Sequence, residues 1–133
     1  MRRARVIICV LLLASCAAQQ RSGARADGRL RLRATEMTTT GAHAIIRGTI
    51  ENTFDEPVYG VRYMVTVYDT RTSKKVDVWQ REVDATIKPG ERAAVNLEVE
   101  SQSMLGRNTR LKVTAHAIKL GGTSIPPPAG WKN

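Results

Sequence analysis

Apolar and polar residues alternate strictly through most of the chain after residue 28, and this pattern predicts β-strands. Alternating segments cover residues 29–34, 43–52, 58–69, 76–83, 93–100 and 111–117, and a short further strand is expected at 84–87. Residues 37–42 and 101–109 are expected to be loops. No segment has a helical period. In the longest predicted strand, 58–69, one face is expected to carry Tyr59, Val61, Tyr63, Val65 and Val67.

Turn residues separate these segments at short intervals. Lys88-Pro89-Gly90-Glu91 predicts a type II turn, because Pro89 suits the first central position and Gly90 accepts a positive φ at the second. Residues 69–75 form another expected turn, and Gly48 inside a strand indicates a bulge or the close approach of another backbone. Connections this short exclude crossover helices. We therefore expect one antiparallel β-sandwich of six or seven strands over residues 29–120.

The chain begins with basic residues, continues with the apolar run Val6–Leu13 and reaches Leu13-Ala14-Ser15-Cys16. This order is that of a secretory signal, and the apolar run is too short to span a membrane. The segment resembles the lipobox of bacterial lipoproteins. The resemblance implies removal of residues 1–15, acylation of Cys16 by chains such as palmitate, and, since Ala17 follows, an outer-membrane anchor facing the periplasm. If the cell has one membrane, the outer face of the plasma membrane is expected. An ordinary cleaved signal is the alternative.

Cleavage would leave 118 residues with 18 basic and 12 acidic side chains, a net charge of about +6. Cys9 would be lost, so no intramolecular disulfide could form. Residues 16–28 are small and polar and predict a flexible tether. The basic excess is concentrated in a patch that spans this tether and the first strand: Arg21, Arg25, Arg29, Arg31 and Arg33.

Two interpretations of this patch stay open. It is a charged edge strand that avoids aggregation, or it is attracted to anionic head groups or envelope polymers. Nucleic acid is not an expected partner, because aromatic residues are few and are not interleaved with the arginines.

Three short motifs resemble those of the FxLYD-type, immunoglobulin-like domains of exported bacterial proteins. Residues 48–52 (GTIEN) resemble a G-x-v-x-N strand end, residues 65–69 (VTVYD) stand where the family has Phe-x-Leu-Tyr-Asp, and residues 87–91 (IKPGE) resemble its Leu-x-Pro-Gly-Glu turn. A family of short envelope lipoproteins with a Tyr-Arg-x-x-Trp-Tyr-Asp strand is also similar. The resemblance implies an immunoglobulin-like sandwich of about seven strands and no active site. The motif residues, read as structural, are Gly48, Asn52, Tyr68, Asp69, Pro89 and Gly90.

Candidate catalytic and metal-binding residues are sparse. The two histidines, His43 and His116, do not make a zinc site, which needs three or four ligands. Met37 and His43 are expected to share a loop, which suggests copper(I) ligation, but a surface histidine beside a buried methionine is the preferred interpretation. No nucleophile–base pair or phosphate loop is evident. We therefore expect no catalytic residues, no metal and no cofactor.

The last segment, residues 121–133 (GGTSIPPPAGWKN), is a proline-rich tail that cannot form a helix or a central strand. It is expected to be a loose end or a strap packed on the sandwich, with a polyproline ligand as the alternative. The expected protein is a lipid-anchored, non-catalytic module that binds a protein partner through a sandwich edge or this tail. A ligand- or metal-handling lipoprotein is the second hypothesis, and a cell-wall-modifying enzyme is the third.

Overall fold

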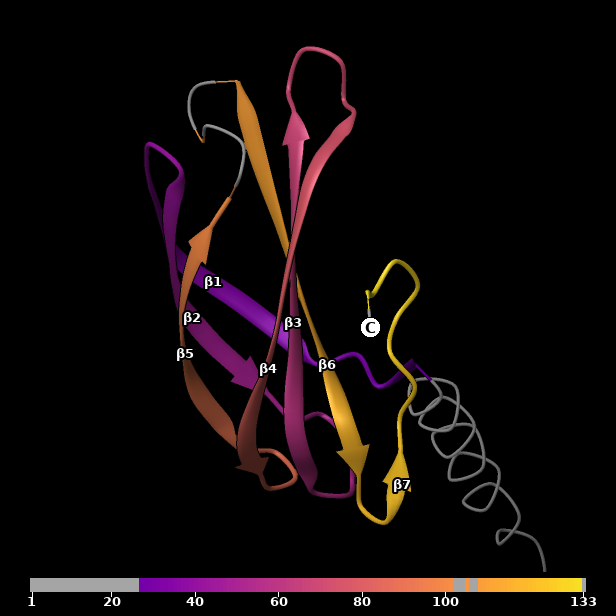
Figure 1. Ribbon diagram of the computed structural model, residues 1–133. Coiled ribbons are helices and arrows are strands. Elements are labelled where there is room, and N and C mark those ends of the chain that lie inside the picture. Colours follow the sequence, from indigo (N-terminus) through magenta and orange to yellow (C-terminus); the bar gives the residue numbers. More distant parts are fainter. Residues whose placement is uncertain (1–26, 102–104, 106–107, 133) are drawn as a thin grey trace, which may run out of the picture.

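The computed structural model describes residues 27–101, 105 and 108–132, and its regular structure consists of strands. Two sheets face each other in a sandwich (Figure 1). The strands are β1 (Arg31–Thr40), β2 (His43–Glu51), β3 (Val58–Asp69), β4 (Lys75–Ile87), β5 (Arg92–Glu100), β6 (Thr109–Leu120) and β7 (Thr123–Ser124).

The strand order is β1-β2-β5 in the first sheet, here called sheet B, and β4-β3-β6-β7 in the second, called sheet A. Every strand pair is antiparallel. Seven strands in sheets of three and four make an immunoglobulin-like sandwich, with one difference from the constant-type arrangement: β4 pairs with β3 instead of β5. The predicted fold class is confirmed.

The core lies between the sheets and is formed by the alternate positions that the sequence pattern selects. Ile46 and Ile50 of β2 and Val65 and Val67 of β3 are at most 1% exposed. Tyr63 also faces the core, and burial raises the pKa of its hydroxyl. Apolar side chains from the two inner faces therefore interdigitate between the sheets.

One predicted core position is wrong. Tyr59 is 43% exposed, whereas its neighbour Val58 is fully buried. Gly60 has φ +77°, a left-handed conformation that interrupts the two-residue alternation. As a result Val58 and Val61 both point inward, although residues three positions apart in a regular strand face opposite sides.

Two predicted strand boundaries are also wrong. Residues 37–40, expected as a loop, continue β1 to Thr40, because the hairpin turns tightly at Gly41 and threonines suit a strand. The strands expected at 76–83 and 84–87 form one strand, β4, whose 13 residues exceed the 12 of β3. β4 stays paired because Asp84 and Ala85 bulge opposite Gly60.

The chain changes sheets just before β1. Leu30 N donates to Ala115 O at 2.9 Å and Ala117 N donates to Gly28 O at 2.8 Å, so residues 28–30 pair with β6 in sheet A. From Arg31 onward the chain pairs with β2 in sheet B. The single strand expected over 29–34 is thus divided between the two sheets.

The C-terminal strap, defined as residues 123–132, packs on the outer face of sheet A (Figure 1). β7 pairs with the end of β6, and Ile125, only 6% exposed, joins the core cluster. Arg62 Nη1 donates to Ile125 O at 2.8 Å, and Lys132 N donates to Gln80 Oε1 at 3.1 Å. Of the two structural interpretations of the tail, the structure shows the packed strap.

Candidate functional site

The predicted basic patch is only partly within the described residues. Cys16, Arg21 and Arg25 lie outside them. Arg29 forms an isolated bridge with His116 of β6, and its side chain is exposed. Arg31 and Arg33 lie in β1. The structure therefore places Arg31 and Arg33 together on sheet B, whereas Arg29 pairs with sheet A and lines neighbouring surface hollows with Arg31.

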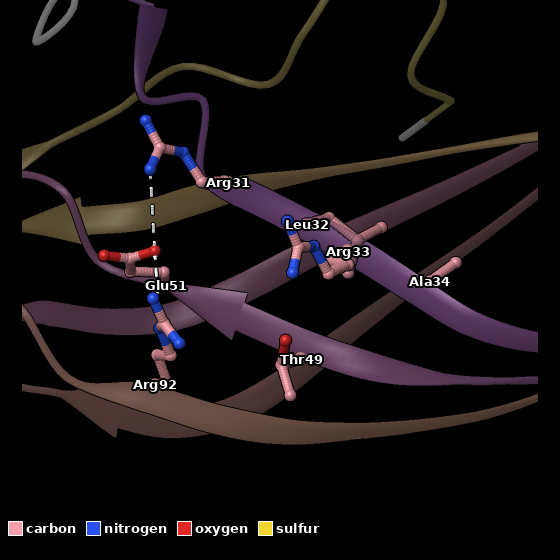
Figure 2. A pocket seen from close by; sticks show the side chains of 7 residues that line it. All are labelled: Arg31, Leu32, Arg33, Ala34, Thr49, Glu51 and Arg92. Carbon is pink, nitrogen blue, oxygen red and sulfur yellow. Dashed lines mark ion pairs between the residues drawn. The ribbon is translucent and has the colours of Figure 1, made fainter.

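Arg31 and Arg33 line a surface hollow of about 450 Å³, here called the arginine hollow (Figure 2). Its lining comes from all three strands of sheet B. In the strand register Arg31 faces Glu51, Glu51 faces Arg92, and Arg33 faces Thr49. Residues directly opposite each other share a face of a sheet, so these five side chains lie on one surface. The complete lining is Arg31, Leu32, Arg33, Ala34, Thr49, Glu51 and Arg92.

A single carboxylate oxygen stands between two guanidinium groups in the hollow (Figure 2). Glu51 Oε2 lies 3.7 Å from Arg31 Nη1 and 3.6 Å from Arg92 Nε. The Glu51 side chain is 23% exposed, whereas each arginine is 71% exposed. Such solvated ion pairs add little stability, about 0–1 kcal/mol. Their main effect is on side-chain position, because Glu51 places the guanidinium groups of Arg31 and Arg92 on either side of its Oε2 atom.

The hollow carries a net positive charge. Arg31, Arg33 and Arg92 supply three guanidinium groups against the one carboxylate of Glu51. Within the described part of the chain, Arg33 has no ion-pair partner. Arg47 on the same face is different, because its Nη1 lies 3.6 Å from Glu36 Oε2. The arginine hollow is therefore a positively charged region of sheet B that is not neutralised by its neighbours.

Sequence reasoning missed Arg92, Glu51 and Thr49 as members of this site. Their outward alternation within β2 and β5 was the available signal, and Arg92 directly follows the turn at residues 88–91. However, 59 positions separate Arg92 from Arg33. Only the β1-β2-β5 strand order brings them together.

Gly48 allows the close approach of β1 to β2, its neighbour in sheet B. A Cβ atom at Gly48 would lie 2.1 Å from the carbonyl oxygen of Arg33 and 2.9 Å from Ala34 Cα. Ala34 faces Gly48 and Glu36 faces Arg47, which leaves Thr35 as an extra residue in β1. This is the combination of a bulge and a close backbone approach that a glycine within a strand indicates.

Asn52 links two of the family-like motifs through hydrogen bonds. Its side chain is fully buried, and its Nδ2 donates to Glu56 O at 2.8 Å and to Ile87 O at 2.9 Å, while Oδ1 accepts from Phe54 N at 2.9 Å. The backbone of Asn52 also pairs with that of Gly90 and Glu91. Asn52 therefore has a structural role, in which it joins the β2–β3 loop to the β4–β5 turn.

The β4–β5 turn has the geometry expected for its sequence. Gly90 has φ +75°, and Glu91 N donates to Lys88 O at 3.0 Å across Pro89. The Glu91 carboxylate accepts from Lys88 N at 2.7 Å. Pro89 and Gly90 thus form the turn and are not part of the arginine hollow.

Tyr68 and Asp69 end β3, and their contacts with other described residues are structural. Asp69 Oδ1 accepts from Arg71 N at 2.7 Å, and Asp69 O accepts from Ser73 N at 2.8 Å, which closes the β3–β4 turn. Tyr68 is half-buried, and the Arg110 guanidinium carbon lies 5.4 Å from its ring centroid.

The described residues contain no group of three or more histidine, cysteine and acidic side chains that could hold a metal ion. Met37 is 52% exposed, so the expectation of a buried methionine is wrong. Met37 shares a face with Ile46, its partner in the register, whereas His43 lies on the opposite face. The two side chains therefore cannot ligate one copper ion from one face. The described residues also contain no helix with the length and apolar character that crossing a membrane requires.

Comparisons with known proteins give weak likenesses. No family model and no curated protein matches the chain. Among solved structures, the uncharacterized lipoprotein yajI from Escherichia coli is similar at a TM-score of 0.45 and 12% identity, over 98% of this chain and 94% of that one. Two structures of Bacteroides uniformis beta-glucuronidase 2 are also similar. One is a calcium binding mutant with a TM-score of 0.42 and 18% identity, over 67% of this chain. The other is covalently bound to cyclophellitol-6-carboxylate aziridine, with a TM-score of 0.43 and 16% identity over 73% of this chain.

The chain spans only 11% and 12% of the length of these two glucuronidase chains. TM-scores at this level do not assign a function. The resemblance to FxLYD-type domains stays a prediction from the three sequence motifs.

Proposed function

We propose that this protein is a lipid-anchored module of a bacterial envelope that binds a protein partner without catalysing a reaction. The anchor is argued from the sequence: a basic start, a short apolar run and a lipobox-like segment that ends at Cys16. Acyl chains on the processed cysteine would hold the domain at a membrane far more firmly than one chain could.

The anchor point and the sandwich are close in the chain. Gly28, whose carbonyl accepts a hydrogen bond from β6, follows Cys16 by 12 residues. A segment of that length spans at most about 40 Å when it is fully extended. The start of β1 would therefore stay near the membrane surface, which makes β1 the first strand that a membrane-associated partner meets.

The observation that carries the proposed binding role is the exposure of β1 as an edge strand. β1 has 10 residues, lies at the end of the β1-β2-β5 order, and pairs only with β2 among the described strands. Nine of its residues are exposed. An edge of this length offers backbone N–H and C=O groups to which a partner can add a strand. A ligand-handling role is the second candidate, favoured by the arginine hollow at the start of the same strand.

Acylation is tested by replacing each cysteine separately in the full chain expressed in its native host. Cys16→Ser is expected to abolish incorporation of labelled palmitate and to release the protein from the membrane fraction. Cys9→Ser is the matched control and is expected to leave both unchanged, because Cys9 lies in the part removed by cleavage. Unlabelled protein, or labelling that persists in Cys16→Ser, would refute the proposed anchor.

Partner binding is tested with a photocrosslinking side chain placed at Thr38 in β1, in intact envelopes. We expect a specific crosslinked protein at this position. The control position is Thr86, an exposed threonine in β4 of the other sheet. The binding role fails if Thr38 captures no protein, or if both positions capture the same proteins equally.

A further inference from the structure

We propose that the arginine hollow is a binding site for a phosphate group, presented either as free phosphate or as a phospholipid head group. Its recognition elements are the guanidinium groups of Arg31, Arg33 and Arg92 and the hydroxyl of Thr49. This inference goes beyond the proposed anchoring and partner-binding roles, and it would hold whether or not Cys16 carries lipid.

The spacing of the three arginines suits a small anion. Arg31 and Arg33 are alternate residues of β1, so their Cα atoms are about 7 Å apart, and β5, which carries Arg92, lies two strand spacings or about 10 Å away. Arginine side chains are long enough to converge on a group held between them. Planar guanidinium groups match the oxygens of phosphate in bidentate geometry, and a threonine hydroxyl adds a neutral donor.

Glu51 positions the site without occupying all its donors. One oxygen, Oε2, faces both Arg31 Nη1 and Arg92 Nε, at 3.7 and 3.6 Å. These distances exceed a normal hydrogen bond, and each guanidinium keeps further N–H groups for a ligand. Glu51 also reduces the charge of the hollow from +3 to +2. That residual charge is suited to a phosphate group, which carries about −1.5 to −2 as a monoester at neutral pH.

Charge is distributed unevenly along the outer face of sheet B, and this favours the hollow over the rest of the face. The opposite end of the face carries Glu98 and Glu100 of β5, both exposed. Arg47, between the two ends, is already paired with Glu36. An approaching anion is thus repelled at one end and attracted at the other, where Arg33 is unpaired within the described part of the chain.

Binding is tested on the full chain in an uncharged detergent that contains no phosphate. Inorganic phosphate is titrated while the NMR signals of the Arg31, Arg33 and Arg92 side chains and the Thr49 amide are followed. We expect saturable shifts at these groups that chloride at equal ionic strength does not produce. Equal shifts with chloride would overturn the proposal. It would also be overturned if phosphate produced no shifts here and phosphatidic acid did not increase the vesicle binding described below.

Matched arginine variants separate a site from general attraction. Arg33→Gln and Arg92→Gln are each expected to weaken phosphate binding about tenfold, because each removes a charged donor from the ligand. Arg47→Gln removes the same charge from the same sheet face outside the hollow, and we expect a change of less than about twofold. Equal weakening in all three variants would show nonspecific attraction and would refute the site. Circular dichroism checks that each variant keeps its strands.

Vesicles identify the source of the phosphate group. The same full chain is mixed with phosphatidylcholine vesicles that contain or lack phosphatidic acid. A head-group site predicts that phosphatidic acid increases vesicle binding and that Arg33→Gln removes this increase. A site for free phosphate predicts saturation by inorganic phosphate and no dependence of vesicle binding on Arg33. Either result supports a phosphate site. If the phosphate site is refuted, the cysteine and crosslinking tests of the proposed function are unaffected.

Discussion

The outer faces of the two sheets differ in whether anything covers them. On sheet A the C-terminal strap lies over the face, and three polar residues of that face, Arg62, Thr66 and His116, are 9% exposed or less. On sheet B no segment within residues 27–132 that the structure describes lies over the corresponding face, and the side chains of Arg31 and Arg92 are 71% exposed. Polar residues are therefore buried on the outer face of sheet A, whereas those of the arginine hollow on the outer face of sheet B are exposed to solvent.

Two arginines show what this difference means for function. Arg62 Nη1 donates to the carbonyl of Ile125 and Nε donates to Glu82 Oε1 at 2.9 Å, so these two donors are used within the fold. Arg33 has no ion pair with any described residue, and it lines an open hollow. The same residue type is structural on the covered face and available for a ligand on the open one.

Removal of the cover is expected to have the largest effect. A chain that ends at residue 122 loses the burial of Ile125, about 1.5–3 kcal/mol, and the charged hydrogen bond from Arg62 to its carbonyl, about 1.5–3 kcal/mol. We expect the free energy of unfolding to fall by about 4 kcal/mol in chemical denaturation. A chain that ends at residue 128 keeps Ile125 and should lose less than about 1 kcal/mol. If the chain that ends at residue 122 were as stable as the full chain, the strap would not cover sheet A.

A methyl group at Gly48 is expected to disturb the open face specifically. Gly48→Ala places Cβ against the Arg33 carbonyl, so β1 must move, at a cost of about 3 kcal/mol in unfolding free energy. The displaced Arg33 should also weaken phosphate binding. Gly122→Ala is the matched control, since a Cβ there meets nothing within 4 Å and the change should be nearly neutral. Calorimetry and the phosphate titration measure the two effects, and an unaltered Gly48→Ala protein would contradict the close approach.

Replacement of one arginine on each face gives the smallest and most direct contrast. Arg62→Ala should lower the free energy of unfolding by about 2 kcal/mol, because it leaves the Ile125 carbonyl without its buried donor. Arg47→Ala should change it by less than about 0.5 kcal/mol, because its ion pair with Glu36 is exposed. Urea denaturation of both variants measures the difference. Similar values for the two would show that cover by the strap has no energetic consequence.

Much of the architecture could be predicted because it depends on local chemistry. Alternation selected the buried positions of β2 and β5, and the Pro89-Gly90 pair marked the turn between β4 and β5. The predictions failed where a local irregularity was compensated by pairing with a neighbouring strand. The left-handed Gly60 turned Tyr59 outward, and the bulge at Asp84 and Ala85 let β4 continue where a break was expected.

The candidate site was predictable only in part. Arg31 and Arg33 were found because they are close in sequence and alternate with apolar residues in the same short segment. Arg92 and Glu51 were not, since nothing in their own segments distinguishes them from other exposed charged residues. Their membership of the hollow depends on the register that aligns Arg31, Glu51 and Arg92 across three strands.

The sequence by itself determined that the chain forms strands, where most of them turn, and which side chains leave the solvent between two sheets. These properties follow from side-chain polarity and backbone preference over a few neighbouring residues. Only the tertiary structure decided which outer face is covered and which arginines gather around Glu51. Those outcomes depend on contacts between residues far apart in the chain, such as Arg62 with Ile125 and Glu51 with Arg92, which no local pattern encodes.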